Sequence, residues 1–179
     1  MKNTNYISKG MTLLEVLVVI TIFAVLGILV TESVALTLQG AKKSASIVRA
    51  RENLDYSMAI IERQIRGAGS ITSQCTTPPA TPAPAAEIDY TDQYGKLSSF
   101  FCVNTGGNDS YIASGSSLLT ASRLTNDTVK IAGCLFTCIT APGSNPPEVD
   151  VDLAMQDASA SGIQSASASA STRIYLRNY

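Results

Sequence analysis

One carboxylate at the edge of a long apolar run constrains this chain more than any other feature. Glu15 directly precedes residues 16–30, which are uncharged and mostly apolar. A carboxylate at membrane depth costs roughly 2.5 kcal/mol or more, so such a residue has a function by default and implies a charged partner. The segment is therefore expected to lie in a membrane or among other apolar helices, with Glu15 making a specific contact.

Two more general explanations of this segment stay open. The first is a plain single-pass anchor, because residues 11–30 supply the roughly 20 residues that a helix needs to cross a bilayer. The second is a secretory signal with a basic leader, an apolar core over residues 16–30 and a small-x-small cleavage site at residues 33–35. A cleaved signal has no reason to carry Glu15, and the helical pattern continues beyond its cleavage site.

Residues 9–15, Lys-Gly-Met-Thr-Leu-Leu-Glu, resemble the class III signal of type IV pilin-like proteins. This group includes prepilins, minor pilins and type II secretion pseudopilins. The resemblance implies that a prepilin peptidase cleaves after Gly10 and that the new amino terminus, Met11, is N-methylated. It also implies that Glu15 pairs with the amino terminus of a neighbouring subunit during filament assembly. Met11 stands where the family usually has Phe, a change that cleavage tolerates better than loss of the glycine.

A helical pattern continues beyond the apolar run. Apolar residues recur at steps of three or four over most of residues 34–65, and no proline interrupts this stretch. Gly67 and Gly69 then supply a helix end. The sequence predicts one continuous helix over about residues 11–66, with two helices broken near Gly40 as the alternative.

The second half of this helix strengthens the resemblance. Residues 50–69 look like the corresponding segment of J-type pseudopilins and W-type minor pilins, and residues 172–178 resemble the closing strand of that group. Major pilins usually carry a proline in the membrane half of the helix, and this chain has none there. The resemblance implies a minor subunit that primes a filament or sits at its tip. Its implied partners are the membrane, other pilin or pseudopilin subunits and an inner-membrane assembly platform.

The remainder of the chain is predicted to be rich in strands and loops. Strands are predicted at residues 87–90, 97–103, 110–113, 129–131, 135–139, 149–154 and 172–176. Residues 159–171, almost all Ser and Ala, are predicted to form a mobile surface loop. The predicted fold class is α+β and pilin-like, with one long helix, half anchor and half amphipathic, packed on an antiparallel β-sheet.

Lys2 and Lys9 precede the apolar run, so the amino terminus should stay in the cytoplasm. The part of the chain after the apolar run should lie on the extracytoplasmic side of the membrane. A filament subunit would then move to the cell surface at the filament tip. We divide the chain into a prepilin leader (1–10), a transmembrane and assembly half of the helix (11–30), an amphipathic half (31–69), a proline-rich connector (70–86) and an extracytoplasmic β-rich domain (87–179).

Four cysteines, Cys75, Cys102, Cys134 and Cys138, fall in the exported part. An even number in an oxidising compartment favours two disulfides, whereas a zinc site would show Cys-x2-Cys spacing. In a strand over residues 133–140, Cys134 and Cys138 lie about 13 Å apart and must each bond one of the other two. A turn within this segment would instead join Cys134 to Cys138. We favour the strand.

Catalysis is not expected, because the chain has no histidine and shows no other catalytic constellation. We predict no cofactor and no metal, although Glu148, Asp150 and Asp152 could supply oxygen ligands to calcium. A formal net charge of −1 gives no support for direct binding of nucleic acid. Competing functions are a DNA-uptake minor pilin, a secretion pseudopilin and a signal-cleaved secreted binding domain.

Overall fold

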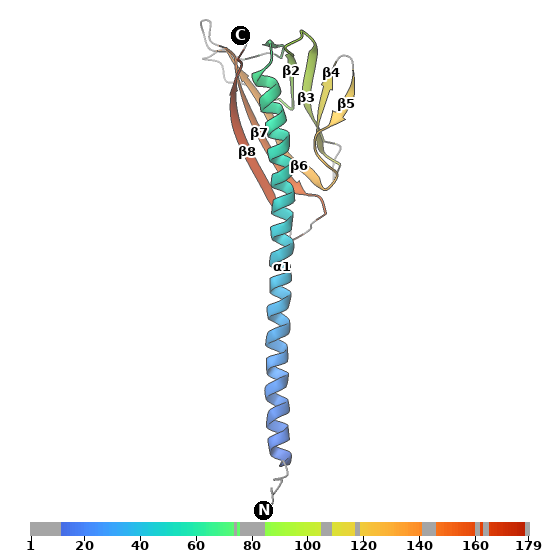
Figure 1. Cartoon of the computed structure of the whole chain (residues 1–179), viewed down its shortest axis with the longest axis vertical. Coiled ribbons are helices and arrows are strands. Elements are labelled where there is room, and N and C mark those ends of the chain that lie inside the picture. The colour runs from blue at the N-terminus through green and yellow to red at the C-terminus, as the bar shows by residue number, and fades with distance from the viewer. Residues whose placement is uncertain are drawn as a thin grey trace, which may run out of the picture. The chain divides into compact units, whose positions relative to one another are not determined.

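A computed structural model describes residues 12–73, 75, 85–104, 109–116, 119–140, 146–159, 162 and 165–177. Two compact units divide the chain, Met1–Ala41 and Lys42–Tyr179. The element order begins with a helix and continues in strands (Figure 1): α1 (Leu13–Arg66), β1 (Ser70–Ile71), β2 (Glu87–Thr91), β3 (Leu97–Val103), β4 (Tyr111–Ser116), β5 (Leu119–Arg123), β6 (Val129–Ile139), β7 (Glu148–Asp157) and β8 (Ser167–Tyr175).

Helix α1 confirms the prediction of one continuous helix, and the alternative of a break near Gly40 is wrong. A glycine inside a helix costs only about 1 kcal/mol relative to alanine, which its helix-forming neighbours offset. The helix ends where predicted. The carbonyl of Arg66 accepts a hydrogen bond from the backbone N–H of Arg177 at 2.9 Å, so the end of the chain satisfies one of the last helical carbonyls.

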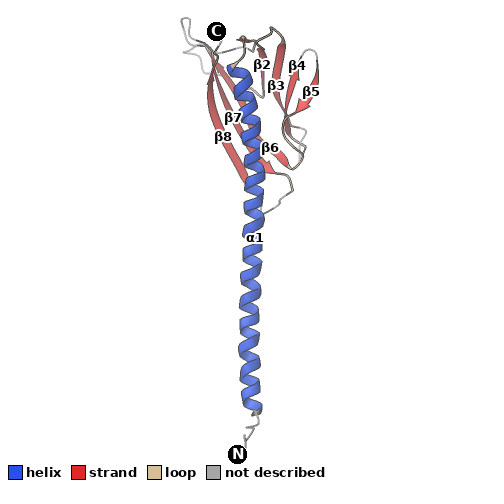
Figure 2. Cartoon of the chain, in the orientation of Figure 1, coloured by secondary structure: helices blue, strands red, loops and turns tan. Residues whose placement is uncertain are grey.

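The strands form two antiparallel sheets (Figure 2), and the α+β class predicted from the sequence is confirmed. One sheet has the order β1-β2-β3-β4-β5 and the other the order β6-β7-β8. An isolated antiparallel bridge pairs Phe136 of β6 with Ala85, which precedes β2.

Several strand predictions need correction. Residues 129–131 and 135–139 belong to the single strand β6. This strand pairs with β7 on both sides of a register shift between Ile131 and Gly133. Strand β5 was not predicted, because its sequence Leu-Thr-Ala-Ser-Arg alternates but contains only one large apolar residue.

The loop predicted over residues 159–171 is wrong from Ser167 onward, where β8 begins. The alternating Ser and Ala of this segment is itself a period-two pattern. Ala166 and Ala168 are buried, while Ser167 and Ser169 face solvent. Alanine is too small to mark a strand by hydrophobicity alone, but pairing with β7 along its whole length holds it in the sheet.

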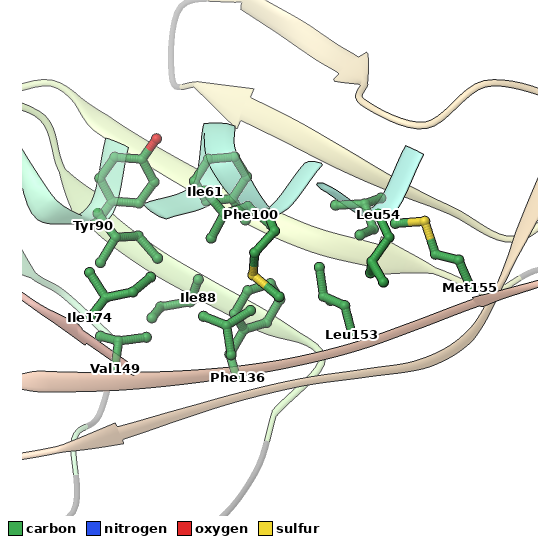
Figure 3. Close-up of a cluster of buried hydrophobic side chains, with 14 of the residues drawn as sticks. Leu54, Ile61, Ile88, Tyr90, Phe100, Phe136, Val149, Leu153, Met155 and Ile174 are labelled. Atoms are coloured by element: carbon green, nitrogen blue, oxygen red, sulfur yellow. The ribbon is translucent and has the colours of Figure 1, made fainter. Parts of the chain in front are cut away.

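The core of the second unit lies between α1 and both sheets (Figure 3). Leu54, Ile61 and Ile65 project from the helix and are at most 2% exposed. Burying each such side chain contributes about 1.5–3 kcal/mol. The sheet residues that complete this core include Ile88, Tyr90, Phe100, Phe136, Val149, Val151, Leu153, Met155 and Ile174.

Candidate functional site

The helix begins with a local motif that involves Glu15. Thr12 precedes the first helical residue, and its hydroxyl accepts a hydrogen bond from the backbone N–H of Glu15 at 3.3 Å. Thr12 is therefore the N-cap, and Thr-x-x-Glu has the spacing of a capping box. Our reading of the sequence missed this local role, although that spacing before an apolar run signals it. The Glu15 carboxylate is exposed at a helix amino terminus, where negative charge is favoured.

The predicted cleavage and methylation positions, Gly10 and Met11, lie outside the described residues. They stay predictions from the resemblance. The proline-rich connector predicted at residues 70–86 likewise lies largely outside them, apart from its two ends.

The first half of α1 presents an apolar surface. Every residue from 12 to 45 is exposed, and Phe23 is 70% exposed. Within the described part of the chain, α1 is the one helix that is both long enough and apolar enough to cross a membrane. Monomeric soluble proteins rarely expose a contiguous apolar patch larger than a few hundred Å². This surface therefore fits a membrane anchor or a contact with partner helices.

Three threonines in this half of the helix donate their hydroxyl groups to hydrogen bonds within the helix. Thr21, Thr31 and Thr37 donate hydrogen bonds to backbone carbonyls three or four residues earlier, at 2.8–2.9 Å. A hydroxyl satisfied inside its own helix can enter an apolar environment without losing a hydrogen bond. These residues are thus compatible with burial in lipid or in a bundle of helices.

The cysteines form two disulfides, Cys75–Cys138 and Cys102–Cys134, with Cα atoms 4.6 Å and 6.5 Å apart. Both Cys134 and Cys138 lie on strand β6, so the prediction of a strand in which each reaches a separate partner is confirmed. Cys102 lies on β3, so one disulfide joins the two sheets directly. In the described residues no cluster of three or more His, Cys, Asp or Glu side chains forms a metal site.

The candidate calcium ligands on β7 are engaged with a cation. Glu148 and Asp150 both form ion pairs of 2.8 Å with Arg173, whose backbone position is opposite Asp150 on β8. Asp152 is exposed farther along the strand. A calcium ion would have to displace Arg173 from the first two carboxylates.

A buried ion pair connects α1 to the end of β7. The carboxylate of Asp157 is fully buried and lies 2.7 Å from the guanidinium of Arg49. Burial alone would raise the pKa of Asp157, but hydrogen bonds from Ser159 and Arg49 outweigh it and lower the pKa to about 2. The pair therefore adds a polar contact to the apolar packing of α1.

The amino-terminal segment matches a family described as the prokaryotic N-terminal methylation motif, over residues 7–31. No curated protein and no solved structure matched the chain. The motif and the long apolar helix together support a type IV pilin-like protein. Such a motif implies processing by prepilin peptidase and assembly with other pilins, and it points to a structural role.

Proposed function

We propose that this protein is a minor subunit of a type IV pilus or of a related type II secretion filament. The observation that carries the proposal is Glu15 at the start of an exposed apolar helix, inside a segment that matches the methylation motif. A carboxylate in that position is costly in lipid and has a defined use in a bundle of identical or related helices.

Processing comes first in this proposal. The chain inserts with its amino terminus in the cytoplasm, and prepilin peptidase cleaves after Gly10. Methylation of Met11 follows, and the mature subunit waits in the membrane with its carboxyl-terminal domain outside. The exposed apolar half of α1 supports this step, because it can span the bilayer without an unsatisfied backbone group.

Assembly then moves this helix half from lipid into the core of a filament, where neighbouring helices bury it. The Glu15 carboxylate would leave the membrane interface and need a cation among apolar side chains. The α-amino group of Met11 on a neighbouring subunit is the cation we propose. Removing one partner of such a buried pair costs about 3–5 kcal/mol, enough to decide whether a subunit joins.

Two features favour a minor rather than a major subunit. The helix has no proline anywhere between Leu13 and Arg66, whereas major pilins usually carry one in the membrane half. Residues 50–69 also resemble J- and W-type subunits. We propose low abundance, a position at the filament tip and association with other minor subunits and the assembly platform.

A pair of matched variants tests the role of Glu15. Glu15→Leu should leave membrane insertion and cleavage intact and abolish recovery of the subunit with sheared filaments. Glu32→Leu is the control, because Glu32 is another exposed carboxylate on the same helix half. Normal recovery of Glu15→Leu, or equal loss in both variants, would overturn the proposed pairing.

Intact mass of the membrane-extracted protein tests processing. Loss of residues 1–10 with addition of one methyl group is expected, and Gly10→Val should accumulate as the uncleaved precursor. A chain that begins at Leu36 would support the alternative of a signal-cleaved secreted binding domain. Shortening of Gly10→Val by the same ten residues would contradict the class III assignment.

Abundance distinguishes minor from major subunits. Deleting the gene should reduce the number of filaments while their diameter and main composition stay the same. If this chain forms the dominant band of purified filaments, the minor role is wrong and the pilin-like fold still holds.

A further inference from the structure

A cleft of about 730 Å³ lies in the second unit. The end of α1 forms one side of it, the turn between β2 and β3 another, and the β4–β5 hairpin the third. Its size is in the range of small-ligand sites. Most of its lining side chains carry hydroxyl or amide groups, including Gln64, Gln93, Ser98, Ser114, Thr120 and Ser122.

The cleft lies where a row of paired residues changes from large apolar side chains to small hydroxyl side chains across the sheet. Ile88, Phe100, Ser114 and Ser122 are paired in sequence across β2, β3, β4 and β5. The first two are buried in the core, whereas Ser114 is half-buried and Ser122 is exposed. The hairpin therefore extends the core-facing side of the sheet with small hydroxyl residues that leave space open.

Bonds within the cleft fix the orientation of its polar groups. The Tyr90 hydroxyl donates a hydrogen bond to Gln64 Oε1, and the Tyr90 ring stacks on Phe100 with centroids 5.4 Å apart. Because Gln64 Oε1 accepts this bond, the Gln64 amide NH₂ is the group that can donate to a ligand. Burial raises the pKa of Tyr90 to about 12, so its hydroxyl remains a donor at neutral pH.

The rim carries one exposed ring and a small positive charge. Asp92 Oδ1 accepts hydrogen bonds of 2.8 Å from the backbone N–H groups of Tyr94 and Lys96, which holds the turn. The Tyr94 side chain is 77% exposed. Arg63 and Lys96 are also exposed, and nothing in the described part of the chain forms an ion pair or hydrogen bond with either side chain.

From this geometry we infer that the cleft binds an acidic oligosaccharide. Hydroxyl and amide walls match a polyol, which needs many donors and acceptors on several sides. The exposed Tyr94 ring offers a flat apolar surface to the C–H face of a sugar. Arg63 and Lys96 supply charge-assisted hydrogen bonds to a sugar carboxylate. Nucleic acid fits less well, because its binding requires neutralisation of several phosphates.

This binding does not depend on filament assembly, so it can be tested on the purified chain alone. The full chain would be held in micelles of a detergent without sugar groups, and saturation-transfer NMR would follow trigalacturonate and sialyllactose as probes. We expect saturable binding of at least one probe and transfer to its ring protons. The neutral trisaccharide maltotriose should bind at least tenfold more weakly.

Variants locate the binding. Tyr94→Ala, Lys96→Ala and the cleft-filling Ser122→Leu should each weaken binding at least tenfold, whereas Tyr94→Phe should retain it. Tyr175→Ala and Lys43→Ala are the matched controls, because both residues are exposed and lie outside the cleft lining. Thermal unfolding of each variant checks that the fold is intact.

Three results would overturn the inference. They are the absence of saturable binding of both acidic probes, equal weakening by the control and cleft variants, and tighter binding of a short single-stranded DNA than of either sugar. If Tyr94→Ala also lowers thermal stability, the comparison of Tyr94→Phe with Ser122→Leu decides the outcome.

Discussion

The two halves of helix α1 differ in whether their apolar side chains are exposed or buried. From Thr12 to Ala45 every side chain is exposed, including many Val, Leu and Ile residues and Phe23. From Ser46 onward one face of the helix is buried in the domain that the rest of the chain forms. The chain therefore covers the apolar surface of one half and leaves that of the other to lipid or to other subunits.

The sequence encodes this difference in its pattern. Residues 16–30 are uncharged and mostly apolar on all sides of the helix, which is typical of a helix surrounded by apolar material. In the second half the buried residues form one stripe, and charged residues such as Glu52, Asp55 and Arg63 lie on other faces. A sheet can cover a stripe, but only a membrane or a bundle can cover the whole circumference.

A matched pair of isoleucines gives the largest expected difference between the two halves. Ile61 is fully buried and Ile22 is 54% exposed. Ile61→Ala should lower the free energy of unfolding by about 2–5 kcal/mol, because it leaves a cavity in the core. Ile22→Ala should change it by less than about 0.5 kcal/mol. Urea unfolding of the full chain in detergent, followed by tyrosine fluorescence, measures both, and equal effects would contradict the comparison.

The disulfides are the next largest contribution, and they act on the second unit alone. Replacing Cys102 and Cys134 together by serine should lower the free energy of unfolding by about 2–4 kcal/mol, because the bond constrains the unfolded chain. Thiol counting on the denatured, unreduced protein should find no free cysteine. Four free thiols, or an unchanged urea midpoint in the double variant, would show that the bonds do not stabilise this unit.

What the sequence predicted well was local. The helix followed from apolar steps of three or four without a proline. The distance between Cys134 and Cys138 on one strand predicted that they do not bond each other, but left open which of Cys75 and Cys102 each one bonds. Both depend only on neighbours along the chain. The fold class followed from these elements together with period-two patterns such as Val149, Val151 and Leu153.

What the sequence did not predict depends on distant partners. The Arg49–Asp157 pair joins residues separated by 108 positions, so neither residue alone reveals that the carboxylate is buried. Strand β5 and the start of β8 have weak hydrophobicity and are held by pairing with β4 and β7. The cleft depends on which serines are neighbours across β3, β4 and β5. The sequence of one strand alone does not reveal this pairing.

The Asp157 carboxylate gives the second unit a dependence on acid that the first half of α1 should lack. Its pKa falls from 3.8 to about 2 on folding. Its contribution is therefore fully present above the unfolded-state pKa and is lost as the pH falls from about 4 to about 2. Urea unfolding across this range measures the slope. Arg49→Met should make the slope shallower, and an unchanged slope in that variant would contradict the assignment.

The smallest expected effect concerns a hydroxyl on the buried face of α1. Ser57 is fully buried, and no hydrogen-bond partner for its Oγ is present among the described residues. An unpaired buried hydroxyl costs free energy, and alanine has the higher helix propensity, so Ser57→Ala should raise the free energy of unfolding by up to about 1 kcal/mol. Ser44→Ala is the control, because Ser44 is exposed on the same helix and isolates the propensity term. If Ser57→Ala destabilises the protein while Ser44→Ala does not, the hydroxyl has a partner in solution, and the buried face of α1 is less apolar than its packing indicates.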